Sequence, residues 1–175
     1  MHSHDCSGHG PPSYSVHQSL DELEFERGIW GSAMDGNIEK LNKILNNVDP
    51  SLPDSSGYTA LHYGARNGRE DVCKLLLVKG ANPNAQTNGG ATPLHRAAYV
   101  GNSRIVSMLL LHKANPSICD SDGKTPLHKA AEGQHHDVIQ MLVAFSPELK
   151  HVKDKRGCTA LNYLKDQCKL SELLS

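Results

Sequence analysis

The sequence predicts an all-α solenoid of about five repeats, with short β-turn fingers between the helix pairs. A phrase of the form Gly-x-Thr-x-Leu-His recurs at residues 57–62, 90–95 and 123–128, and a fourth copy at 157–162 ends in asparagine. The threonines of the four copies lie 33, 33 and 34 residues apart. A fixed period of this length indicates stacked supersecondary units, and the apolar residues between the phrases recur at helical spacing.

The N-terminal part of the chain lacks the phrase. Residues 1–18 are rich in Ser, Gly, His and Pro without periodicity, which predicts a disordered tail. Residues 19–53 carry two apolar stretches at helical spacing on either side of Gly36-Asn37, so we expect two helices before Asp49-Pro50. This pair is interpreted as an atypical capping repeat, because a terminal repeat exposes one side to water and departs from the consensus.

Three regular repeats are expected at residues 54–86, 87–119 and 120–153, followed by a short C-terminal capping repeat at 154–175. The glycine of each phrase suits the positive φ of a tight turn, and the threonine suits a helix N-cap. Five positions before each threonine stands a short polar side chain that can accept backbone hydrogen bonds in the turn. These residues are Asp54, Thr87, Asp120 and Asp154.

Two positions depart from the repeat pattern. Gln134 stands where Gly68 and Gly101 stand in the other repeats, so we expect the turn between that pair of helices to be rearranged. Lys113 closes a helix where Gly80 does so one repeat earlier. A left-handed conformation at Lys113 would be strained.

The repeated phrases resemble those of the ankyrin-repeat family, whose unit is a β-turn followed by two antiparallel helices. The resemblance covers residues from about 25 to 174. It implies that fingers and first helices line a concave groove, and that His62, His95 and His128 are hydrogen-bonding residues. A shared metal ion is not expected, because one repeat, about 10 Å, separates successive histidines while zinc ligands lie about 2 Å from the ion.

The concave face is where we expect a protein partner to bind. Tyr and Arg are enriched where interfaces concentrate their binding energy, and two rows of this face carry both. The alternative for any one position is that the residue only keeps the exposed surface soluble and binds no partner. The residues predicted to bind the partner are Tyr58, Tyr63, Arg66, Arg96, Tyr99, Lys124 and Lys129, with Tyr63, Arg66, Arg96 and Tyr99 at the centre.

The predicted function is that of a non-catalytic adaptor or scaffold, monomeric and without a cofactor. The alternative is an inhibitor that masks a partner's functional surface. No phosphate-binding loop or nucleophile elbow occurs in the sequence, so an enzyme is not expected. With 18 Lys and Arg against 19 Asp and Glu, the chain lacks a nucleic-acid-binding charge pattern. Without an apolar run of membrane-spanning length, a soluble protein of the cytoplasm or nucleus is expected.

The N-terminal tail offers an alternative function in metal or redox sensing. His2, His4, Cys6 and His9 supply imidazole and thiol ligands, but no second ligand set is placed to close a tetrahedral site. The five cysteines of the chain are scattered without a C-x-x-C pair, so reduced thiols are expected.

Asn84 is a candidate modification site through the resemblance alone. The ankyrin-repeat family includes substrates of an asparaginyl β-hydroxylase that favours a leucine eight residues before the asparagine. Leu76 occupies that position here, whereas Ser117 replaces the asparagine in the next repeat. We therefore expect Asn84, and not the equivalent position of the next repeat, to be hydroxylated.

Overall fold

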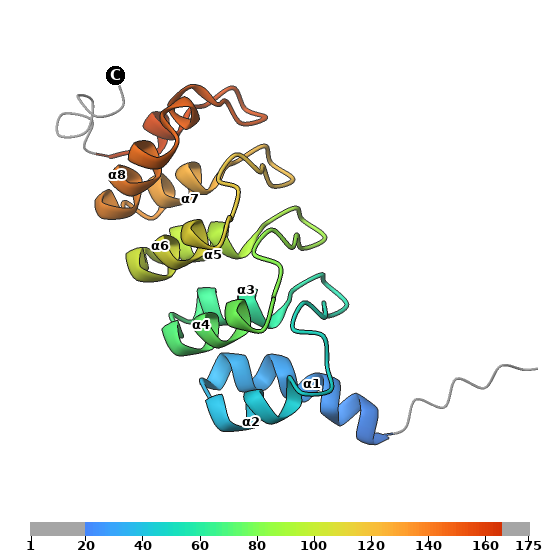
Figure 1. Ribbon diagram of the computed structural model, residues 1–175. Helices are drawn as coiled ribbons and strands as arrows, with labels where there is room; N and C mark the ends of the chain where they lie inside the picture. Colours follow the sequence, from blue (N-terminus) through green and yellow to red (C-terminus); the bar gives the residue numbers. More distant parts are fainter. Residues whose placement is uncertain (1–19, 166–175) are drawn as a thin grey trace, which may run out of the picture.

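The computed structural model describes residues 20–165, which form a stack of helix pairs (Figure 1). No strand is assigned within this range. The elements are α1 (Leu20–Asp35), α2 (Ile38–Ile44), α3 (Ala60–Arg66), α4 (Glu70–Val78), α5 (Pro93–Val100), α6 (Ser103–Leu111), α7 (Pro126–Glu132), α8 (His136–Phe145), η1 (Pro147–His151) and η2 (Ala160–Tyr163).

The helices form two layers. Helices α1, α3, α5 and α7 contact one another in succession, and α2, α4, α6 and α8 do the same in the second layer. The loops that connect one pair to the next project as fingers to one side of the stack (Figure 1). This arrangement confirms the predicted all-α repeat solenoid.

Each finger is built around the polar residue that precedes the phrase. Asp54 Oδ1 accepts hydrogen bonds from the backbone N–H groups of Ser56 and Tyr58, both at 2.8 Å. Gly57 takes the positive φ that the turn requires, +78°, and Thr59 then begins α3 as its N-cap. Asp120 and Asp154 accept backbone hydrogen bonds in the same way.

Neighbouring fingers are joined through their backbones. The N–H of Asn88 donates to the carbonyl of Ser56 at 3.0 Å, and the N–H of Ser121 donates to the carbonyl of Gly89 at 2.8 Å. The N–H of Lys155 continues the series to the finger of residues 120–125. Backbone hydrogen bonds therefore connect the successive fingers along the stack.

The histidine links tie each first helix to the following finger. The Thr59 N–H donates to His62 Nδ1 at 3.1 Å, so Nδ1 is the acceptor and Nε2 carries the proton. Nε2 then donates to the carbonyl of Ala91 at 3.0 Å. The three histidine links are His62 to Ala91, His95 to Lys124 and His128 to Cys158.

Burial keeps these imidazoles neutral. It lowers the pKa of His62 and of His95 to about 4, and the pKa of His128 in the same direction. A neutral imidazole with both nitrogens bonded is the form that a buried link requires. The predicted structural role of the signature histidines is therefore borne out by the geometry.

Leucines of the phrase and apolar residues of the second helices form one continuous core. Leu61, Leu94 and Leu127 are fully buried in the first layer. Ile105 and Ile139 are fully buried in the second. Burying such a side chain contributes roughly 1.5–3 kcal/mol, and each repeat needs its neighbour to complete that burial.

The turn between α7 and α8 corrects one prediction. Gln134 has φ +59°, close to the +81° of the equivalent Gly101, so the turn keeps the common conformation and the expected rearrangement is wrong. The Gln134 amide donates to the carbonyls of Ala131 and Tyr163, both at 2.8 Å. Its Oε1 accepts the N–H of Lys165 at 3.1 Å. These three hydrogen bonds offset the strain of a left-handed glutamine.

The two ends of the described stack are closed differently. At the N-terminal end, Trp30 Nε1 donates to the carbonyl of Leu52 at 3.2 Å and ties α1 to the segment before the first finger. At the C-terminal end, Asn162 replaces the histidine, and its Oδ1 accepts the N–H of Thr159 at 2.8 Å. Asn162 thus keeps the cap of η2.

Candidate protein-binding face

The inner row of the concave face consists of the residues four positions after each phrase threonine. Three of them bond to the aspartate of their own finger. Tyr63 donates to Asp54 Oδ2 at 2.7 Å, and Tyr163 donates to Asp154 in the same way. Lys129 Nζ lies 3.1 Å from Asp120 Oδ2. The sequence analysis missed these bonds, although the aspartate and its partner are nine residues apart in all three repeats. The inner row is Tyr63, Arg96, Lys129 and Tyr163.

These bonds set the protonation of the groups involved. The pKa of Tyr63 is raised to about 12, mainly by burial and to a smaller extent by the hydrogen bond to Asp54. The hydrogen bond from Tyr163 lowers the pKa of Asp154. Burial alone would raise the pKa of Asp120, but the N–H of Lys124 and the ammonium of Lys129 lower it overall. Tyr63 and Tyr163 therefore stay neutral hydrogen-bond donors at neutral pH, while Asp120 and Asp154 are ionised.

Arg96 is the exception in the inner row, because Thr87 occupies the place of the aspartate. Thr87 Oγ1 accepts the N–H of Ala91 at 3.1 Å and offers no charge. The Arg96 guanidinium instead donates to the hydroxyl of Tyr58, and its carbon lies 4.9 Å from the centroid of the Tyr58 ring. Arg96 Nε is buried without a hydrogen-bond partner.

The next repeat neutralises both of its predicted binding lysines. Lys124 and Lys129 share the carboxylate of Glu132, the latter at 3.5 Å, and their side chains are only 11% and 18% exposed. Lys124 Nζ also lies 4.8 Å from the centroid of the Tyr163 ring. Glu132 stands 33 residues after Tyr99, in the same register of the repeat, but the sequence analysis missed this pairing.

Arg66 and Tyr99 form the outer row of the same face, one helical turn beyond Tyr63 and Arg96. Both residues are exposed, and 55% of Tyr99 is accessible. Among the described residues Arg66 makes no ion pair. The structure thus brings together Tyr58, Tyr63 and Arg96 in one cluster and leaves the outer row open to solvent. Binding of a partner by these residues stays a prediction.

Asn84 lies at the base of a finger, where it bridges two repeats. Its Nδ2 donates to the carbonyl of Lys113 at 3.1 Å, and its Oδ1 accepts the N–H of Asn115 at 2.7 Å. Lys113 adopts the left-handed conformation that the sequence analysis described as strained, with φ +66°. Hydroxylation of Asn84 stays a prediction, and mass spectrometry of the cellular peptide from Gly80 to Gln86 tests it, since absence of a +16 Da species would contradict it.

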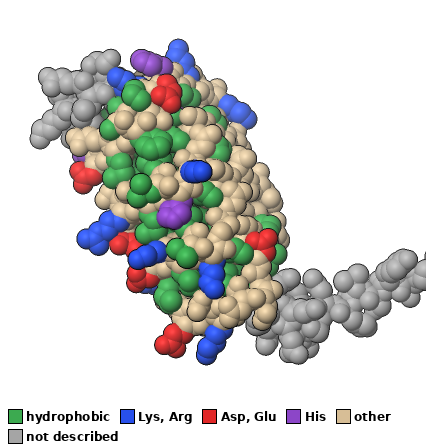
Figure 2. Space-filling model, viewed as in Figure 1, with side chains coloured by type: hydrophobic (Ala, Val, Ile, Leu, Met, Phe, Trp, Pro, Cys, Tyr) green, Lys and Arg blue, Asp and Glu red, His purple; other side chains and the backbone are tan. Residues whose placement is uncertain are grey.

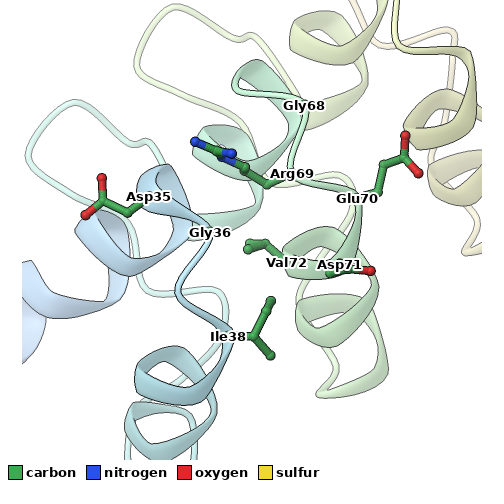
Figure 3. Close-up of a pocket in the computed structure, with 8 residues that line it drawn as sticks. All are labelled: Asp35, Gly36, Ile38, Gly68, Arg69, Glu70, Asp71 and Val72. Carbon is green, nitrogen blue, oxygen red and sulfur yellow. The ribbon is translucent and has the colours of Figure 1, made fainter.

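A polar hollow of about 340 Å³ lies between the α1–α2 and α3–α4 turns. In Figure 3, Arg69 reaches toward α1 while Glu70 points away from Asp35. Arg69 Nε donates to the carbonyl of Met34 at 3.0 Å, so this arginine caps the end of α1. The hollow is thereby explained as a junction between two repeats.

An apolar groove of about 390 Å³ runs between α6 and α8, on the second helix layer. Figure 2 shows hydrophobic side chains gathered along this side of the molecule. Leu111 is 80% exposed and Phe145 is 55% exposed at its edge. The signal in the sequence is the apolar last residue of α4, α6 and α8, which lies outside the buried stripe. The groove is lined by Ser107, Leu110, Leu111, Met141, Ala144 and Phe145.

Two further predictions fall on other parts of the chain. The tail ligands His2, His4, Cys6 and His9 lie outside the described residues. Within residues 20–165, no three His, Cys, Asp or Glu side chains are grouped so as to hold a metal ion. In the same part of the chain, every helix is too short or too polar to cross a membrane.

Comparison with known proteins defines the class to which this fold and face belong. The family model for ankyrin repeats (three copies) matches residues 29–120 and 97–170, so the chain belongs to the ankyrin-repeat family. It is similar to ankyrin repeat domain-containing protein 39, with 47% identity over 77 residues of the human protein and 50% over 64 residues of the bovine protein.

These matches cover less than half of either partner in the alignment. They span 43% and 36% of this chain, and 42% and 35% of the human and bovine relatives. A human NAD-capped RNA hydrolase, NUDT12, is 40% identical over 70 residues. That match spans 39% of this chain and 15% of the hydrolase. The hydrolase activity in that name therefore describes a protein of which only a small part is compared.

Proposed function

We propose that this chain is a non-catalytic adaptor or scaffold that binds a protein partner through its concave face. The observation that carries the proposal is the exposed outer row, Arg66 and Tyr99, beside the Tyr58–Arg96 cluster. Ankyrin repeats are generally protein-interaction modules, and this face concentrates the side chains that dominate interfaces. We further propose that the binding module acts inside the cell, in the cytoplasm or nucleus.

Proximity labelling in cells, followed by pull-down of the labelled neighbours, tests the proposal. Arg66→Ala combined with Tyr99→Ala removes two exposed side chains and leaves the finger bonds of Tyr63 and Tyr58 intact. Lys74→Ala combined with Leu111→Ala is the matched control, because it removes one exposed cation and one large exposed side chain from the second layer. We expect the first pair to lose a protein that the control keeps. Unchanged neighbours with the first pair would contradict the proposal.

The same experiment separates an adaptor from an inhibitor. An adaptor needs two separable surfaces, so the Arg66→Ala, Tyr99→Ala protein should lose one set of neighbours and keep another. An inhibitor needs only one surface, so that variant should lose every specific neighbour. Restored activity of the released partner would then identify masking as the function.

A further inference from the structure

We propose that the concave face between α3 and α5 receives a carboxylate side chain of the protein partner, with Arg96 and Arg66 as its cationic ligands. This inference rests on the proposed function, because it names the chemistry of the partner that the same face would bind. It is carried by a local surplus of positive charge that the neighbouring repeat does not share.

Arg96 holds hydrogen-bonding capacity that the chain itself does not use. A guanidinium presents five N–H donors, yet among the described residues its single hydrogen bond goes to the neutral hydroxyl of Tyr58. Its Nε is buried and unpaired. Leaving such a donor unpaired carries a desolvation penalty, so an acceptor that draws the guanidinium toward itself relieves it.

The nearby acidic group is already committed. Asp54 accepts two backbone N–H groups on Oδ1 and the Tyr63 hydroxyl on Oδ2. Neither Arg96 nor Arg66 forms an ion pair among the described residues. Two arginines and one aspartate leave this part of the face with one positive charge.

The surroundings favour a side chain that lies on the concave face where the two helices meet. Arg66 and Tyr99 occupy equivalent exposed positions on α3 and α5, and these helices contact each other directly. The Tyr58 and Tyr63 rings lie 5.4 Å apart, and the Arg96 guanidinium lies over the Tyr58 ring. Aromatic walls exclude water from a charge pair and thereby strengthen it.

The charge balance favours a carboxylate over a phosphate. One carboxylate neutralises the single surplus charge, and its two oxygens match the planar fork of a guanidinium. A phosphorylated side chain brings about −1.5 to −2 charges, more than this face compensates. A nucleic acid needs a longer basic stripe than two arginines provide.

Thr87 supplies a test that leaves both arginines in place. Thr87→Asp gives Arg96 the internal acid that Lys129 already has in Asp120. Three of the four fingers carry aspartate at this position, so the substitution suits the turn. Thr87→Asn is the matched control, since it keeps a side-chain acceptor for the turn and adds no charge. Thermal unfolding of both variants confirms that they fold.

The binding probe is a displayed library of short random peptides, selected on the wild-type protein. Selected peptides are then synthesised with Glu, Gln or phosphoserine at the enriched acidic position and titrated by calorimetry. We expect acidic residues to be enriched. Replacing Glu by Gln should weaken binding roughly tenfold, and Thr87→Asp should do the same while Thr87→Asn changes it by less than about threefold. The two losses should not add, because they remove one interaction.

The possible failures are distinguishable. No acidic preference, or equal binding by Thr87→Asp and Thr87→Asn, overturns the carboxylate inference; the proposed function survives if Arg66→Ala with Tyr99→Ala still abolishes binding. Tighter binding of the phosphoserine peptide overturns the inference in favour of a phosphorylated partner. A selection that yields no peptide, or only peptides insensitive to the Arg66→Ala, Tyr99→Ala pair, counts against the inference and the proposed function together.

Discussion

The repeats at 87–119 and 120–153 share a backbone but use their charges differently. In the second of them, Lys124 and Lys129 are neutralised by Asp120 and Glu132 within the repeat. In the first, Thr87 stands in place of the aspartate, and Arg96 turns to the neutral ring of Tyr58. The comparison teaches that one finger residue decides whether an inner-row cation is consumed by the fold or left for a ligand.

Acidification tests the links that both repeats share, and it should have the largest effect. Unfolded histidines have a pKa near 6.5, while burial lowers that of His62 and His95 to about 4. The unfolded chain therefore binds more protons between these values, so stability is full above about pH 7 and is lost as pH falls. Between about pH 7 and about pH 5 each histidine should remove about 2 kcal/mol from the free energy of unfolding.

Urea unfolding followed by circular dichroism across this pH range measures the loss. In the His95→Asn variant the free energy of unfolding should fall less steeply with decreasing pH, because one histidine fewer takes up a proton on unfolding. A free energy of unfolding that stays flat from neutral to mildly acidic pH would show that the imidazoles are not held neutral.

Truncating His95 should have the next largest effect. His95→Ala leaves the N–H of Thr92 and the carbonyl of Lys124 without their partner in a buried place, and it opens a cavity. We expect a loss of about 3 kcal/mol in the free energy of unfolding. His128→Ala should lose less, because its link to the carbonyl of Cys158 is longer, at 3.2 Å against 2.9 Å for His95. Equal losses in the His95→Ala and His128→Ala variants would contradict the expected difference between the two links. His112→Ala, at an exposed position, is the control.

Removing Glu132 should make the second repeat resemble the first. Glu132→Gln deprives Lys124 and Lys129 of their shared carboxylate, whose side chain is 21% exposed. We expect a loss of about 1 kcal/mol in thermal or urea unfolding. Acidic peptides should then bind more tightly, since the face gains one positive charge. Unchanged peptide affinity would mean that the released lysines do not reach a peptide bound on the concave face. Glu148→Gln on η1 is the matched control.

Replacing Gln134 should have the smallest effect. Gln134→Gly relieves the strain of φ +59° but removes three side-chain hydrogen bonds. The relief is about 1 kcal/mol, and each of the three partly exposed hydrogen bonds contributes about 0.5 kcal/mol, the low end of the usual range. We therefore expect a net loss of no more than about 1 kcal/mol in urea unfolding. A clear gain in stability would show that the bonds contribute little and that strain dominates this turn.

Much of the fold follows from local residue types. The glycine, threonine and histidine of each phrase specify a turn, a cap and a link within a few residues of one another, so their period was enough to predict the solenoid. Gln134 shows the limit of this reasoning, because its local propensity argued for a rearranged turn. The side-chain bonds that stabilise the turn come from the Tyr163 carbonyl and the Lys165 N–H, 29 and 31 residues away.

The binding face shows the same division. Tyrosine and arginine at equivalent positions of successive repeats were readable along the chain, because the repeat period places them in one row. The bond of an inner-row residue to its own finger is signalled by the separation of nine residues, but the group that a neighbouring finger brings within reach is decided only by the folded stack. Among the described residues Arg96 forms no ion pair because Thr87 replaces the aspartate of its own finger, and only the folded stack brings Tyr58, 38 residues earlier, against it.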